Sequence, residues 1–170
     1  KILSSSYGDK HILAFHDYGL LAYYLPELEE AWGTPAGMFA LNLLNERNCR
    51  VAEGLYRNSI SLAMATLALP FVELECWEMS PESTARIRSV LDRLFRPQTM
   101  MNRMTESALR VLILQALFAD PENLDRMVET KSYAHARELL LIRTAVMDGD
   151  VDAAARLWPA GSSGRRRSGK

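Results

Sequence analysis

The side chains best suited to acid–base or ligand chemistry near neutral pH are the three histidines, at positions 11, 16 and 135. His135 and Glu138 stand three residues apart, so on a helix both face the same side and can meet one ligand. His16 and Asp17 are adjacent, so on a helix they point in different directions and form a poor base–carboxylate pair. The alternative interpretation places His135 at the surface or at the edge of the core.

Arginines provide the second candidate chemistry. Glu73 and Glu75 lie in an apolar segment, where a buried carboxylate requires a partner. Four arginines are candidates for that partner, namely Arg57, Arg103, Arg110 and Arg143. A guanidinium in a cavity can instead grip an anionic small molecule through two parallel hydrogen bonds. The candidate ligand-binding residues are therefore His135, Glu138, Arg110 and Arg143, with structural ion pairs or simple exposure as the alternative.

The sequence lacks the short motifs of common enzymes. It has no glycine-rich phosphate loop, no G-x-S-x-G turn around a serine nucleophile and no H-E-x-x-H zinc motif. We therefore expect no catalytic residues, no metal and no cofactor, in a protein that is not an enzyme.

Helix signals dominate the chain that must position these residues. Ser80-Pro81-Glu82 and Asp120-Pro121-Glu122 are typical helix starts, Gly149 suits the position after a helix end, and Asp150 can cap a last short helix ending before Pro159. No hairpin turn and no sustained alternation of apolar and polar residues indicates a strand. The expected helical segments are 18–32, kinked or split at Pro26; 35–48; 53–79, bent or broken at Pro70; 80–94; 99–118; and 120–147.

Composition supports one all-α domain. The 170 residues are 48 % hydrophobic and 24 % charged, which is ordinary for a globular chain. We expect a single-domain bundle of six or seven helices over residues 1–159 and a flexible basic tail over residues 160–170. Without the tail's four cations the chain has 16 basic and 21 acidic residues, a net charge of −5 that disfavours general nucleic-acid binding.

Location and assembly follow from the apolar segments and the cysteines. No apolar run is long enough to span a membrane, and Cys49 and Cys76, without C-x-x-C spacing, predict buried reduced thiols in a cytoplasmic protein. Segments 60–74 and 108–118 are apolar almost all round, which predicts that one of them also faces a second subunit in a homodimer. A thick single core is the alternative.

Two blocks of the sequence resemble a known family. The residues LALPFVELECWEMSPESTARIRSVLDRL (67–94) are similar to the first two helices of the FadR-C-terminal effector-binding domain of GntR-type regulators. The residues ELLLIRTAVMDGDVDAAARLW (138–158) are similar to that domain's end. Where many members carry a metal-binding His after the Glu that corresponds to Glu138, this chain has Leu139, so the resemblance implies a metal-free member.

The resemblance implies a function. It is that of an effector-sensing, dimerising domain of a bacterial transcription regulator, which binds a small anionic metabolite and reaches DNA only through a separate or diverged domain. The alternative is a helical protein-interaction or assembly module without a small-molecule pocket, which the same apolar helices favour equally.

Overall fold

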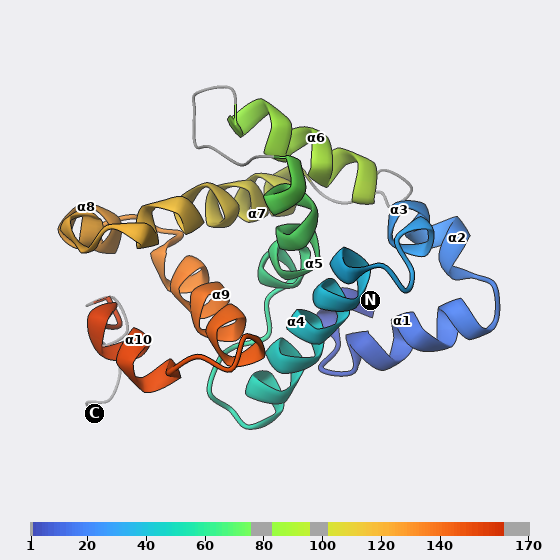
Figure 1. Ribbon diagram of the computed structural model, residues 1–170, viewed down its shortest axis with the longest axis horizontal. Coiled ribbons are helices and arrows are strands. Elements are labelled where there is room, and N and C mark those ends of the chain that lie inside the picture. The colour runs from blue at the N-terminus through green and yellow to red at the C-terminus, as the bar shows by residue number, and fades with distance from the viewer. Residues whose placement is uncertain (1, 76–82, 96–101, 162–170) are drawn as a thin grey trace.

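The computed structural model describes residues 2–75, 83–95 and 102–161 (Figure 1). Within them the chain forms ten α-helices and three short 3₁₀-helices with no strand, in one compact domain, which confirms the all-α prediction. Helix 80–94 was expected to start at Ser80-Pro81-Glu82, which lies outside the described residues, as do Cys76 and residues 162–170 of the tail. The described residues form more helices than the expected six or seven, because α1 lies in none of the expected segments and two of those segments are divided into shorter helices.

The element bounds are as follows: η1 Ile2–Ser4, α1 Gly8–Asp17, α2 Leu21–Tyr24, α3 Pro26–Glu30, α4 Pro35–Ala52, α5 Ile60–Glu75, α6 Ser83–Phe95, α7 Asn102–Gln115, η2 Ala116–Ala119, η3 Pro121–Asn123, α8 Leu124–Val128, α9 Tyr133–Val146 and α10 Val151–Leu157.

Helix α5 is the centre of the bundle. Every residue from Leu62 to Val72 is buried, and α5 packs against α4, α6, α7 and α9 (Figure 1). Of the bend or break predicted at Pro70, the break is wrong, because α5 runs through it. An interior proline costs a helix about 3 kcal/mol, and here packing on all sides outweighs that cost. Leu109 and Leu112 of α7 belong to the same core, so both all-round apolar segments are accommodated within one chain, and the homodimer stays a prediction.

The two divided segments have local causes. Segment 18–32 splits at Leu25, which ends α2 and precedes Pro26 at the first position of α3. Segment 120–147 is interrupted after Val128, because both the amide and the hydroxyl of Thr130 donate to the carbonyl of Met127, at 2.9 and 2.8 Å. The side chain thus satisfies a carbonyl that a continuing helix would have used.

Capping residues match the sequence in two places out of three. Asp120 and Asp150 accept hydrogen bonds from the backbone amides two and three residues on, at 3.0 and 2.8 Å, as predicted. The position after the end of α9 is occupied by Asp148, with φ of 54°, and not by Gly149. Gly149 follows it because a Cβ there would lie 2.8 Å from Cγ2 of Thr144.

Candidate functional site

Two of the four predicted ligand-binding residues lie in one half-buried group of polar side chains, which we call the polar cluster. It forms where α4, the loop 53–59, the start of α5 and the start of α9 meet. Its members are Arg47, Arg50, Tyr56, Ser59, His135 and Glu138.

Glu138 is engaged by Arg50 from 88 residues away in the chain. Arg50 donates from Nε to Oε1 at 2.5 Å and from Nη2 to Oε2 at 3.2 Å, with side chains only 13 % and 3 % exposed. Burial by itself would lower the pKa of Arg50, but the hydrogen bond and charge of Glu138 raise it above its usual value. The pair therefore fastens α9 to α4 as ions.

His135 links α9 to the start of α5. Its Nε2 lies 2.9 Å from Oγ of Ser59, and that oxygen also accepts a hydrogen bond from the amide of Leu62 at 3.3 Å. Burial lowers the pKa of His135, and the charge of Glu138 opposes this effect. A neutral imidazole can accept a hydrogen bond from the Ser59 hydroxyl group. The serine oxygen can then accept a hydrogen bond from the backbone amide of the helix.

Tyr56 covers the imidazole from the loop side. Its ring meets that of His135 edge-on, with centroids 5.8 Å apart. Burial and the charge of Glu138 raise the pKa of Tyr56 to about 12, so the phenol stays neutral. The surroundings of the predicted pair thus differ: Glu138 belongs to an ion pair with Arg50, and His135 packs as a neutral ring against the neutral ring of Tyr56.

Arg47 is the most deeply buried charged residue of the described chain, at 1 % exposure. It donates to the carbonyl oxygens of Ser5 and Ser59 at 3.2 and 3.1 Å and to the side-chain oxygens of Asn48 and Asn58. Its Nε has no partner, and burial lowers its pKa. Arg47 therefore ties the N-terminal turn and the loop 53–59 to α4 through neutral acceptors.

The other two predicted residues lie outside the polar cluster. Arg143 donates from Nε to Oε1 of Glu73 at 2.9 Å in a partly exposed pair. This is one of the ion pairs that the sequence offered as the alternative to ligand binding. Arg110 is exposed on α7, near the carboxylate of Glu106. The structure thus groups His135 with Glu138 and separates both from Arg110.

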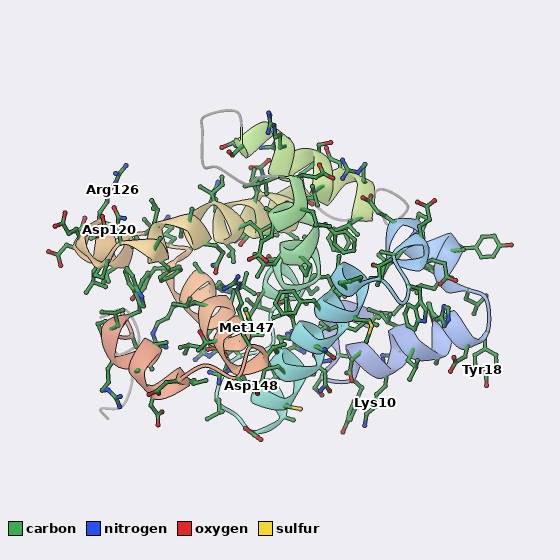
Figure 2. The ribbon with its side chains drawn as sticks, viewed as in Figure 1. Lys10, Tyr18, Asp120, Arg126, Met147 and Asp148 are labelled. Atoms are coloured by element: carbon green, nitrogen blue, oxygen red, sulfur yellow. The ribbon has the colours of Figure 1, made fainter. Side chains whose placement is uncertain are left out.

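The second candidate site was missed by the sequence reasoning and consists of exposed apolar side chains. Five of the eleven exposed large hydrophobic side chains among the described residues fall within residues 13–24. We call this group the tyrosine edge: Leu13, Tyr18, Leu20, Tyr23 and Tyr24. Helices α1, α2 and α3 stand together at one side of the molecule, opposite α8 and α10, and Tyr18 points away from the end of α1 (Figures 1 and 2).

The tyrosine edge stands on an ordered scaffold. Helix α1 ends in a hydrogen-bonded turn in which Gly19, with φ of 66°, donates to the carbonyl of His16 at 2.9 Å. The His16 ring stacks on Trp32 with centroids 3.8 Å apart, and its Nδ1 lies 2.9 Å from Glu29 of α3. These contacts fix α1 against α3, so the backbone at the end of α1 is held in place before any partner arrives. Four of the six tyrosines in the chain lie within residues 7–24, which was the signal available in the sequence.

In residues 2–75, 83–95 and 102–161, no group of three or more His, Cys, Asp or Glu side chains is placed to hold a metal ion. No helix in those ranges is both long and apolar enough to cross a membrane. Cys49 was expected to be buried and is exposed on α4.

Fold and sites together define the chain as a single-domain all-α protein with a polar cluster inside and a tyrosine edge outside. In comparisons with family models, curated proteins and solved structures, nothing matches it. The resemblance to the effector-binding domain of GntR-type regulators therefore stays a hypothesis.

Proposed function

We propose that this chain is a helical protein-interaction module that binds another polypeptide through the tyrosine edge. The observation that carries the proposal is the concentration of exposed rings between α1 and α2, with Tyr18 and Tyr23 exposed at 80 % and 76 %. Tyrosines are enriched at protein interfaces, because the ring supplies apolar contact area with few rotatable bonds and the hydroxyl forms hydrogen bonds. Exposed apolar side chains that form a contiguous patch mark binding surfaces, and five of them fall within twelve residues here.

Order in the scaffold supports the same function. A surface held by the Gly19 turn and by the His16–Trp32 stack loses little conformational freedom on binding, which favours affinity. Leu157 on α10 is also exposed, but no other exposed large hydrophobic residue of the described chain lies close to it in the sequence. It therefore serves as the control for an exposed hydrophobic side chain outside the tyrosine edge.

Site-specific photo-crosslinking in the native cell tests the proposal. A photoreactive residue at Ala22, exposed on α2, should give a discrete crosslinked species, whereas the same residue at Asp152 on α10 should not. The partner identified in this way is then purified and titrated. Tyr18→Ala with Tyr23→Ala should weaken its binding at least tenfold, and the control Leu157→Ala should leave it unchanged. Equal affinity of all variants would contradict the proposal.

A second candidate function is favoured by the polar cluster. We also propose, as the alternative, an effector-sensing domain of a cytoplasmic bacterial transcription regulator. It would act as a homodimer, with DNA contacted by a separate domain. His135 and Glu138 lie where three helices meet, so an anionic metabolite that displaced Glu138 from Arg50 would change how α9 sits on α4.

This candidate predicts a stabilising ligand. A thermal-shift screen of carboxylate and phosphate metabolites should raise the melting temperature of the wild type and not that of Arg50→Gln. Arg126→Gln, an exposed arginine of α8, is the matched control and should respond as the wild type. If no compound stabilises the chain, the effector-sensing function is rejected.

A further inference from the structure

We infer that the tyrosine edge takes a basic partner, a polypeptide segment with apolar side chains flanked by Arg or Lys, and not a second copy of this chain. The inference rests on the proposed interaction function and deepens it by naming the chemistry of the occupant. It starts from the charge distribution around the exposed rings.

The segment that carries the tyrosine edge is strictly acidic. Residues 13–34, which span the end of α1, α2 and α3, contain four acids and no Lys or Arg. The acids are Asp17, Glu27, Glu29 and Glu30, so this segment has a net charge of −4 with His16 neutral. The nearest cations in the chain on either side are Lys10 and Arg47.

Two of the four carboxylates already have partners. Arg93 of α6 donates from Nε to both carboxylate oxygens of Glu27 at 3.1 and 3.2 Å, and Glu29 meets His16. Asp17 and Glu30 are exposed, and no cation of the described residues pairs with either. Asp17 directly precedes Tyr18, the most exposed ring of the edge. The segment that carries the rings therefore includes two exposed carboxylates without a cationic partner among the described residues.

This arrangement suits arginine and lysine chemically. A guanidinium can lie over the face of a tyrosine ring and at the same time donate to a neighbouring carboxylate. An apolar segment with such cations at its rim would bury the rings and neutralise Asp17 and Glu30 together. Nucleic acids and anionic membrane surfaces carry the same negative charge as this segment and would be repelled.

Charge also decides against self-association through this surface. A symmetric dimer places the same patch of both copies face to face. The exposed carboxylates of Asp17 and Glu30 from both copies would then meet across one interface, and like charges in contact suppress association. Any homodimer of this chain is expected to use another face.

The inference is tested with the full chain and three synthetic amphipathic peptides that share one apolar face. Their rims carry only Arg, only Gln or only Glu, and binding is followed by fluorescence anisotropy at 50 and 300 mM NaCl. The Arg-rimmed peptide should bind at least tenfold more tightly than the Gln-rimmed one at low salt. The difference should shrink at high salt, because the charges involved are exposed.

Variants assign the binding to the tyrosine edge. Asp17→Asn with Glu30→Gln should weaken the Arg-rimmed peptide severalfold and leave the Gln-rimmed peptide unchanged. Tyr18→Ala with Tyr23→Ala should weaken both, and the distant control Asp152→Asn should weaken neither. Circular dichroism of each variant verifies that the fold is retained.

Three outcomes overturn the inference. The first is equal binding of the Arg- and Gln-rimmed peptides through Tyr18 and Tyr23, which leaves the interaction function standing with a different partner. The second is concentration-dependent dimerisation, detected by sedimentation, that the two tyrosine substitutions abolish. The third is the absence of binding by any of the three peptides. The proposed interaction function is a separate matter, and it fails only if the crosslinked partner binds the Tyr18→Ala, Tyr23→Ala variant as tightly as the wild type.

Discussion

The buried ion pair between Arg50 and Glu138 should contribute far more to stability than the exposed pair between Arg143 and Glu73. Removing one member of a buried pair typically costs 3–5 kcal/mol, because the other charge stays buried without compensation. Here Arg50 is 13 % exposed, and Glu46 and Glu53 also attract it, so part of the charge remains compensated. Glu138→Gln keeps the shape and one acceptor, and we expect it to lower the free energy of unfolding by about 2 kcal/mol.

The matched control is the exposed pair of Arg143 and Glu73. Its two side chains are 38 % and 39 % exposed, and exposed pairs contribute about 0–1 kcal/mol. Urea unfolding followed by circular dichroism measures both variants, and an unchanged dependence on urea concentration shows that the loss is one of stability. Replacing Arg50 by Met and Glu138 by Leu together should recover most of the loss. If Glu138→Gln costs no more than Glu73→Gln, the pair does not fasten α9 to α4.

Three further predictions concern α9 and α10. Asp148→Gly should raise the melting temperature by about 2–4 °C, because it relieves the positive φ and removes a negative charge from a helix C-terminus, whereas Asp148→Ala should lower it in the same thermal scan. Burial lowers the pKa of His135 in the folded chain, so as pH falls below about 6.5 this histidine is protonated in the unfolded chain before it is protonated in the folded one. Urea titrations between pH 7 and 5 should therefore show stability falling with pH, less steeply in His135→Gln; an equal slope would contradict this. Arg137 donates to the carbonyl of Trp158 at 2.5 Å, so Arg137→Ala should speed proteolysis of α10, and an unchanged cleavage rate would deny that role.

Local signals were enough to predict the fold class and several helix ends. Asp120, Asp150 and Pro26 act within three residues of themselves, so the sequence alone predicted their positions correctly. The course of α5 through Pro70 depends on packing from four other helices, which no local pattern contains. The contact that requires a glycine at position 149 is with Thr144, and the positive φ falls one residue earlier, at Asp148, which the sequence did not indicate.

The candidate sites show the same division between local and long-range information. The spacing of His135 and Glu138 correctly placed both on one helix, but their partners Ser59 and Arg50 are 76 and 88 residues away. The tyrosine edge escaped prediction for a different reason. Apolar side chains are assumed to be buried, and only the folded chain shows that the ring of Tyr18 is 80 % exposed.

The central position of α5 restricts how this sequence can change over evolutionary time. A helix buried along its whole middle has no solvent-facing position at which substitutions are neutral. Ala63, Ala65 and Ala68 are fully buried, so any larger side chain there would push a neighbouring helix outward. Divergent relatives should therefore keep the side-chain volumes of α5, whereas α10, which has no buried residue, can vary. A search that compares side-chain volumes would then find relatives that a comparison of residue identities does not.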